Sequence, residues 1–131
     1  SEMGIRDRRM STKDGGTGGS IVNLSSGAAK YGSPGEYVDY AASKAAIDTL
    51  TIGLANEVAE EGIRVNAVRP GFIDTEIHQS GGEPDRMERV RPLVPMKRVG
   101  QADEVADAIM WLLSDKASYT TGTILDVSGG R

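Results

Sequence analysis

YVDYAASKAAIDTLTIGLANEVAEEGIRVNAVRPG, residues 37–71, contains the two patterns that decide the fold. Its alanines would let another element approach closely, and four apolar side chains recur at helical spacing: Ile47, Leu50, Leu54 and Val58. Gly62 suits a helix end. Residues 63–69 then include an isoleucine and two valines and are closed by a Pro-Gly pair. We therefore predict a long helix over 37–61 and a strand over 63–69.

The segments on either side continue this alternation. Residues 21–24 form a short apolar run between glycines and serines, which is typical of a buried strand. Residues 102–113 carry an apolar stripe at helical spacing, with Gln101 or Asp103 near the start, and residues 123–127 are predicted to be the last strand. Helices that alternate with strands in this way indicate an α/β fold with a parallel sheet and right-handed crossovers.

Three other segments are less regular. Residues 1–13 mix methionines and an isoleucine with charged residues, which suits the end of an amphipathic helix. DGGTGGS, residues 14–20, precedes a strand, whereas the dinucleotide-binding fingerprint must follow a strand and open a helix, so we predict a plain flexible loop. Residues 72–100 are polar, contain prolines and follow a strand end directly. We predict that they form a mobile substrate flap.

Composition excludes several classes of protein. The 131 residues are 38% hydrophobic and 26% charged, as in ordinary globular proteins, and the net charge of −4 lacks the basic footprint of a nucleic-acid-binding protein. No apolar run approaches the ~20 residues of a membrane span, and no signal-peptide core begins the sequence. Cysteines are absent and there is a single histidine, so we expect no metal site and a cytoplasmic location.

Tyr40 and Lys44 are the residues whose spacing points most directly to chemistry. Side chains four residues apart share one face of a helix, so a phenol and an ammonium should lie side by side. A nearby positive charge favours the phenolate form of a tyrosine, which suits proton transfer. Ser26 follows a predicted strand, where open α/β sheets place their ligands. Taken alone, however, a Tyr-x-x-x-Lys pair is more often an ordinary surface pair.

The motifs around Tyr40 and Lys44 favour a functional role for this pair. NLSS at 23–26, YAASKAA at 40–46 and IRVNAVRPG at 63–71 occur in this order, and together they closely resemble the classical short-chain dehydrogenase/reductase family. The resemblance runs from about Ser20 to the end of the sequence. It implies that residues 1–131 form a single partial domain, the second half of a Rossmann-type doubly wound parallel sheet. Only three strands of that sheet are predicted, which would leave one edge and much of two apolar faces uncovered.

The resemblance assigns catalytic roles to three residues. Tyr40 matches the general acid/base of the family. Lys44 matches the lysine that favours the phenolate and binds the nicotinamide ribose. Ser26 matches the serine that holds the substrate oxygen, although Ser25 is a rival and the gap from Ser26 to Tyr40 is often one residue shorter in the family.

The resemblance also implies a cofactor site. Tyr40 and Lys44 would contact the cofactor, together with a Pro-Gly-x-x-x-Thr stretch whose matching residues are Pro70, Gly71, Ile73 and Thr75. In the family this stretch holds the nicotinamide carboxamide; without the resemblance, Pro70 and Gly71 would indicate a plain turn. The cofactor is NAD or NADP. The residues that choose between them belong to the first half of such proteins, which has no counterpart in these 131 residues.

The implied function is an NAD(P)-dependent oxidoreductase that transfers a hydride between a nicotinamide and a small carbonyl or secondary alcohol substrate. Family members commonly form homodimers or homotetramers through the helix over 37–61 and through the last helix and strand. One alternative is a non-catalytic fragment or assembly module. Another is a nucleotide-dependent epimerase or dehydratase. Substrate identity would depend on the loop after Ser26 and on flap residues such as Glu76, Ile77 and His78.

Other polar and aromatic residues have weaker claims to a role. We expect His78 to be inert, and Asn23 and Asn66 to bond the backbone near strand ends. Tyr31 and Tyr37 could line the substrate mouth or simply pack. Three arginines of the flap could meet an anionic substrate or a cofactor phosphate, or form a solvated face: Arg86, Arg89 and Arg91.

Overall fold

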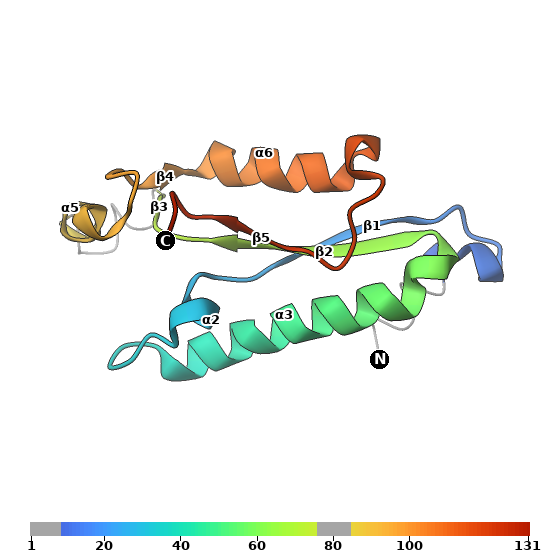
Figure 1. Cartoon of the computed structure of the whole chain (residues 1–131), viewed down its shortest axis with the longest axis horizontal. Helices are drawn as coiled ribbons and strands as arrows, with labels where there is room; N and C mark the ends of the chain where they lie inside the picture. The colour runs from blue at the N-terminus through green and yellow to red at the C-terminus, as the bar shows by residue number, and fades with distance from the viewer. Residues whose placement is uncertain (1–8, 76–84) are drawn as a thin grey trace.

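A computed structural model describes residues 9–75 and 85–131, and its centre is a parallel sheet (Figure 1). The sheet contains β1 (Gly19–Leu24), β2 (Ile63–Pro70) and β5 (Ile124–Val127) in the order β1-β2-β5. Both pairings are parallel, with Ile21 opposite Val65 and Arg69 opposite Asp126. The three predicted strands and their parallel arrangement are therefore confirmed.

Helices cover both faces of this sheet. Helix α3 (Val38–Val58) lies on one face and α6 (Ala102–Leu113) on the other, as Figure 1 shows, so the sheet is doubly wound as predicted. The short 3-10 turn η2 (Ala59–Glu61) continues α3 to Gly62, whose φ of 74° is the left-handed conformation expected after a helix. The long helix predicted over 37–61 is thus confirmed to within a residue.

The core lies between α3 and β2. Ala55 and Val58 of the helix pack against Ile63 and Val65 of the central strand, and Met10 adds to the same cluster. Strand β2 is buried along most of its length because it has a neighbour on each side and a helix on each face. This buried strand places its own carboxyl end, and those of its neighbours, at one edge of the molecule.

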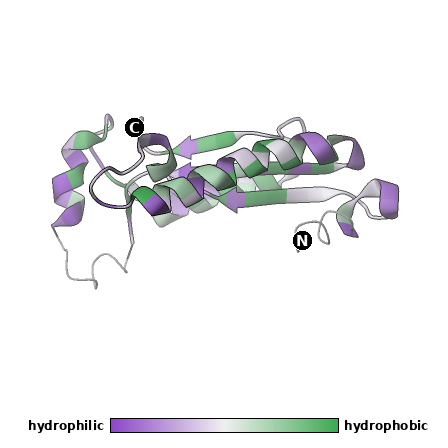
Figure 2. Cartoon of the chain, turned by 90° about the horizontal axis from the view of Figure 1, so that it is seen from below, coloured by the Kyte–Doolittle hydropathy of each residue, from purple (hydrophilic) through white to green (hydrophobic). Residues whose placement is uncertain are grey.

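The outer surfaces of the two long helices retain exposed apolar side chains. Leu50, one of the four apolar residues at helical spacing, is 47% exposed, and Ile52 is 46% exposed. On α6, Met110 and Trp111 are likewise exposed. Figure 2 shows hydrophobic and hydrophilic segments mixed along α3 rather than separated. Leu50 is exposed because no described element covers that side of the helix.

Helix α6 is fixed at both ends by polar contacts. At its start, the side chain of Gln101 caps the first turn, while Glu104 accepts a hydrogen bond from the Gln101 amide (3.1 Å) and pairs with Arg98 (2.7 Å). Gln101 rather than Asp103 is therefore the N-cap. At its end, Arg64 of β2 donates to the carbonyl oxygen of Leu112 (2.9 Å), before the 3-10 turn η4 (Asp115–Ala117). The Arg64 hydrogen bond therefore joins the end of α6 to the central strand.

The segment predicted as a flap contains short regular elements. Strand β3 (Ile73–Asp74) pairs in parallel with β4 (Gly100–Gln101), and between them lie α5 (Arg86–Val90) and the 3-10 turn η3 (Arg91–Leu93). Residues 76–84, which include Glu76, Ile77 and His78, lie outside the described residues. The flap thus remains a prediction for that part of the chain.

Smaller departures from the sequence prediction occur near the amino terminus. The loop expected after Ser26 contains a helical turn, α2 (Ala28–Tyr31). Residues 9 and 10 are helical, as predicted for the end of a helix, and the 3-10 turn η1 (Thr12–Asp14) follows; residues 1–8 lie outside the described residues. Asn66 bonds the backbone as expected, but the amide of Asn23 donates to the Thr51 hydroxyl (3.0 Å) instead.

Candidate active site

The candidate active site lies where the three parallel strands end. Main-chain hydrogen bonds continue past the strands and bind their carboxyl-terminal loops together: the Gly27 amide donates to Pro70 (2.8 Å), and the Gly71 amide donates to Val127 (3.0 Å). Gly71 also passes very close to the loop after β5, since a Cβ atom there would lie 2.9 Å from the Cβ atom of Ser128. The backbone of this edge is therefore tightly constrained.

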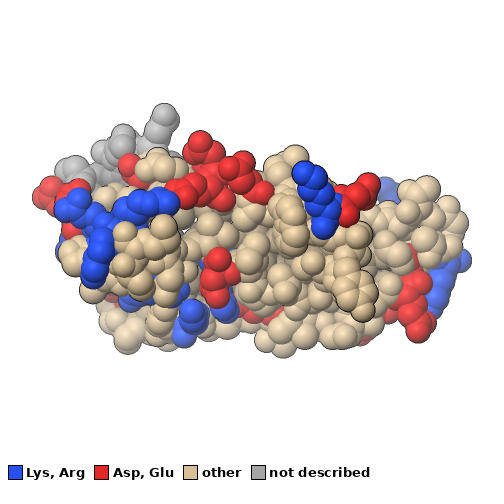
Figure 3. All heavy atoms as spheres, turned by 45° about the horizontal axis from the view of Figure 1, so that its top comes forward, with Lys and Arg blue, Asp and Glu red and all other residues tan. Residues whose placement is uncertain are grey.

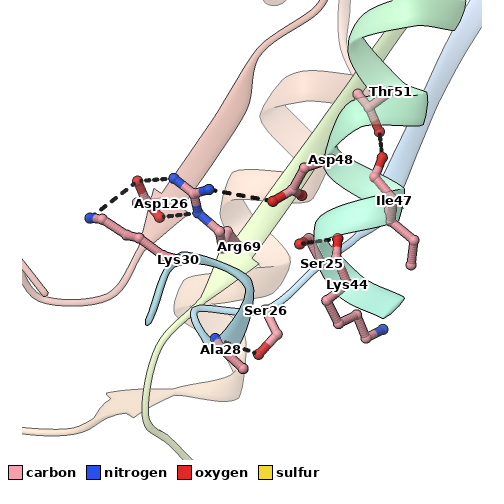
Figure 4. A network of polar contacts seen from close by, with 10 residues as sticks. All are labelled: Ser25, Ser26, Ala28, Lys30, Lys44, Ile47, Asp48, Thr51, Arg69 and Asp126. Atoms are coloured by element: carbon pink, nitrogen blue, oxygen red, sulfur yellow. Dashed lines mark hydrogen bonds and ion pairs between the residues drawn. The ribbon is translucent and has the colours of Figure 1, made fainter. Parts of the chain in front are cut away.

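Two adjacent serines after β1 occupy different environments. Ser25 is only 3% exposed, and its hydroxyl donates to the main-chain carbonyl of Lys44 at 3.4 Å, so it faces α3 (Figure 4). The Ser26 side chain lines a cavity, and its Oγ accepts a hydrogen bond from the Ala28 amide at 3.1 Å. That amide begins α2, which means that the short helix holds the Ser26 hydroxyl in place. The Ser26 hydroxyl proton remains free to be donated into the cavity.

Tyr40 and Lys44 lie on one face of α3, as the spacing predicted. The Lys44 ammonium is 5.6 Å from the centroid of the Tyr40 ring and donates to the main-chain carbonyl of Leu24 at 3.2 Å. Tyr37 packs edge-on against Tyr40, with 6.4 Å between ring centroids. Tyr40 is nevertheless 46% exposed. The lysine is thus tied to the end of β1, and the phenol beside it remains accessible.

One cavity of about 660 Å³ brings several of the predicted residues together. Its wall includes five of them: Ser26, Tyr40, Pro70, Gly71 and Ile73. Lys44 and Thr75 are not among the described residues of the wall, although Lys44 adjoins it through Tyr40. Tyr31 and Tyr37, whose roles the sequence left open, also line the cavity. Its size suits a small organic ligand.

A charged network that no sequence pattern indicates lies beside the site (Figure 4). Arg69, at the end of β2, donates to both carboxylate oxygens of Asp126 (2.7 and 2.9 Å) and reaches Asp48 of α3 (3.4 Å). Lys30 of α2 lies 4.0 Å from Asp126. The hydrogen bonds from Arg69 hold the pKa of the Asp126 carboxyl below its ordinary value, and Asp126 in turn raises the pKa of Arg69. The network joins two strands and two helices at the edge that carries the site.

Comparison with known proteins supports the same assignment. The family model described as enoyl-(acyl carrier protein) reductase matches residues 7–131. This chain belongs to the short-chain dehydrogenase/reductase family. Among its relatives is the uncharacterized oxidoreductase YgfF of Escherichia coli K12, which is 68% identical over 124 residues, or 95% of this chain and 50% of the relative.

Two further relatives extend the comparison within the short-chain dehydrogenase/reductase family. The 3-oxoacyl-[acyl-carrier-protein] reductase FabG of Thermotoga maritima is 46% identical over 86% of this chain and 45% of its own length. The crystal structure of 3-oxoacyl-[acyl-carrier protein] reductase from Brucella melitensis superposes with a TM-score of 0.76 at 44% identity, covering 85% of this chain and 41% of that one. The chain therefore spans about half the length of the curated relatives it matches.

Membership of the short-chain dehydrogenase/reductase family confirms the predicted Rossmann-type fold. Two further observations apply to residues 9–75 and 85–131 only. No helix there has the length and apolarity needed to cross a membrane. No three carboxylate or histidine side chains in those segments gather in a way that could hold a metal ion.

Proposed function

We propose that this chain supplies the proton-transfer part of an NAD(P)-dependent oxidoreductase that interconverts a carbonyl compound and a secondary alcohol. The observation that carries the proposal is one arrangement of three side chains. Ser26 and Tyr40 line the same cavity at the carboxyl ends of the strands, and the Lys44 ammonium lies 5.6 Å from the Tyr40 ring. A hydroxyl donor, a phenol and a cation in this order suit reactions in which an oxygen gains or loses a proton.

In the reductive direction we propose a role for each side chain. When bound, NAD(P)H supplies the hydride that reaches the carbonyl carbon. Tyr40 gives its hydroxyl proton to the carbonyl oxygen, so that the product is an alcohol and the phenol becomes a phenolate. The Lys44 ammonium stabilises that negative charge. In the oxidative direction Tyr40 takes the proton back from the alcohol.

Ser26 positions the substrate oxygen in this proposal. Its Oγ already accepts a hydrogen bond from the Ala28 amide (3.1 Å), which directs the hydroxyl proton elsewhere. A substrate oxygen in the cavity is the acceptor that remains. Ser25 cannot bind the substrate oxygen without breaking its contact with α3, because its side chain is buried and its hydroxyl is bonded to the Lys44 carbonyl. The geometry therefore favours Ser26 over its neighbour.

The residues present fit the nicotinamide end of the cofactor, which we propose to be NAD or NADP. Pro70, Gly71 and Ile73 lie in the same cavity wall as the two catalytic hydroxyls, so a group bound against them would be next to a substrate oxygen held by Ser26. Thr75 belongs to the same motif and follows β3. We propose that these residues and the Lys44 ammonium hold the nicotinamide and its ribose.

We also propose that the complete protein is a homodimer or homotetramer. Exposed apolar side chains on the outer surfaces of α3 and α6 support this, since such side chains are common where protein subunits meet. Light scattering coupled to size-exclusion chromatography tests the proposal directly. A mass of two or four copies would support it, and a monomer at micromolar concentration would contradict it.

The experiment that tests the enzymatic proposal uses the protein in its natural length. Oxidation of NADH and NADPH is followed with a panel of ketones and aldehydes, for the wild type and for Tyr40→Phe. Loss of the phenol should lower kcat by roughly 10³- to 10⁴-fold and leave the Kd of the cofactor within about twofold, because only proton transfer is removed. Tyr119→Phe is the matched control, since Tyr119 is fully exposed and lies away from the cavity. Equal turnover in wild type and Tyr40→Phe would contradict the proposal.

A further inference from the structure

Arg131 is held between two aromatic rings at the cavity. Its guanidinium carbon lies 4.8 Å from the centroid of the Tyr31 ring and 5.0 Å from that of Phe72. Ser128 Oγ donates to the Arg131 main-chain carbonyl (3.0 Å), which fixes the backbone next to β5. Stacking on two rings restricts the long side chain to one place, so less conformational entropy is lost when the guanidinium binds a ligand.

One nitrogen of this guanidinium has no acceptor among the residues that the structure describes. Nη1 of Arg131 is buried and makes no hydrogen bond within the described residues. A buried N–H of a cation without an acceptor is costly, because it has lost its hydrogen bonds to water and has formed none within the protein. An anionic oxygen delivered by a ligand would remove that cost.

Two carboxylates that share a hollow with Arg131 are already engaged. A second hollow, of about 470 Å³, shares Arg131 with Asp126 and Glu104. Asp126 is bound by Arg69 through two hydrogen bonds (2.7 and 2.9 Å), and Glu104 is bound by Arg98 in the same way (2.7 and 3.0 Å). Neither carboxylate therefore neutralises the charge of Arg131.

Among its described lining residues, the active-site cavity has more basic than acidic side chains. Arg131 lines it together with Arg86 and Arg89, whereas Glu36 is the one carboxylate among its described lining residues. Figure 3 shows several lysine and arginine side chains at the end of the molecule that carries α5, with acidic side chains among them. Arg91, which is not among the described lining residues, pairs with Glu88 at 2.9 Å. The described wall of the cavity that holds Ser26 and Tyr40 therefore has more basic than acidic side chains.

We propose that the substrate of this enzyme carries an anionic group, a carboxylate or a phosphate, and that the Arg131 guanidinium binds it while the reacting oxygen lies at Ser26 and Tyr40. Arg86 provides a second positive charge on the same cavity wall. A planar guanidinium suits two-point binding of either anion. This inference rests on the proposed oxidoreductase function and narrows its substrate class. A cofactor phosphate is the competing source of the anion, and the experiment below separates the two.

The test compares charged and neutral versions of the same substrate in the complete protein. The pairs are acetoacetate with methyl acetoacetate, and dihydroxyacetone phosphate with dihydroxyacetone. For the better charged substrate, Arg131→Gln should lower kcat/KM by roughly 10- to 100-fold, mainly through KM, and should change the neutral partner less than about twofold. Arg131→Lys should restore only part of the loss, because it keeps the charge without the planar fork. Arg91→Gln is the matched control and should behave as wild type.

A binding measurement keeps the inference separate from the proposed function. Calorimetric titration of acetoacetate and dihydroxyacetone phosphate, without cofactor, should show binding of at least one anion that Arg131→Gln abolishes. Such binding without turnover of any substrate would overturn the oxidoreductase proposal and leave the anion site in place. Turnover with no preference for charged substrates would overturn the anion-site proposal and leave the oxidoreductase proposal standing. An Arg131→Gln effect confined to the KM for NADPH would do the same. A fold check by thermal unfolding accompanies each variant.

Discussion

Arg69 and Asp126 stand directly opposite each other in the parallel pairing of β2 and β5, and two hydrogen bonds join their side chains. The Arg69 side chain is only 19% exposed, and Asp48 of α3 adds a third contact at 3.4 Å. This residue pair therefore fastens a strand and a helix to the central strand, immediately before the Pro70-Gly71 turn of the site.

Loss of this ion pair should reduce stability. Asp126→Asn leaves Arg69 with Asp48 alone, so the free energy of unfolding should fall by about 1 kcal/mol; the loss is modest because solvent partly screens the pair. Urea denaturation of the complete protein measures the change. Glu60→Gln is the matched control: the Lys13–Glu60 pair spans 3.9 Å with side chains 61% and 90% exposed. Its effect should be within about 0.5 kcal/mol of zero. Equal losses in both variants would show that the Arg69 network stabilises the fold no more than an exposed surface ion pair does.

The same pair should give the protein an acid-dependent stability. Hydrogen bonds from Arg69 lower the pKa of Asp126 below its ordinary value of 3.8, so the folded state binds this proton less readily than the unfolded chain does. The stabilisation is therefore fully present above pH ~4 and is lost as pH falls through the lowered pKa.

Urea denaturation between pH 6 and 2 tests the acid dependence. The stability difference between wild type and Asp126→Asn should be constant above pH ~4 and should shrink below it. Glu104, whose pKa Arg98 lowers to about 2, remains in both proteins, so some acid dependence will persist in the variant. A difference that stays constant down to pH 2 would refute the assignment to Asp126.

The sequence predicted those parts of the site that depend on local spacing. Tyr40 and Lys44 share a helix face because they are four residues apart, and Ser26 lies at a strand end because the apolar run stops before it. The layer order followed from the alternation of helices and strands. In each case the relevant neighbours are set by secondary structure, whose periodicity is readable from one chain.

Contacts that depend on tertiary structure could not be predicted in this way. Arg69 and Asp126 are 57 residues apart, and only the pairing of β2 with β5 places them opposite each other. Arg131 reaches Tyr31 and Phe72 because the loop after β5 turns back toward α2 and β3. No motif spacing indicates either contact. The exposure of Leu50 was likewise unpredictable, since an apolar side chain on a helix can face a core or a partner.

Replacement of the two serines should separate catalysis from stability. Ser26→Ala should lower kcat by roughly 10²-fold with little effect on unfolding, because it removes a donor to the substrate oxygen. Ser25→Ala should instead reduce stability by up to about 1 kcal/mol and affect kcat less, because its hydroxyl is buried against the Lys44 carbonyl. Steady-state kinetics and urea denaturation of both variants provide the comparison. A larger kcat loss for Ser25→Ala would reverse the assignment.

Gly71→Ala should disturb the site through the backbone rather than through any lost side chain. The new Cβ atom would lie 2.9 Å from Cβ and 3.0 Å from Cα of Ser128, and neither atom can move without shifting the main chain. The strand ends would separate, and the hydrogen bond from the Gly71 amide to Val127 (3.0 Å) would weaken. We expect the free energy of unfolding to fall by about 1–3 kcal/mol and kcat/KM to fall with it.

Gly53→Ala is the matched control for Gly71→Ala, since a Cβ atom there meets nothing within 4 Å in the described chain. Alanine is also the better residue inside α3, so the free energy of unfolding should stay the same or rise by up to about 1 kcal/mol. Thermal unfolding and kinetics of both variants test the argument. If Gly71→Ala retained wild-type stability and activity, the strand ends would be free to separate, and the tight closure of the loops around the cavity would not be needed to hold Ser26 and Tyr40 in place.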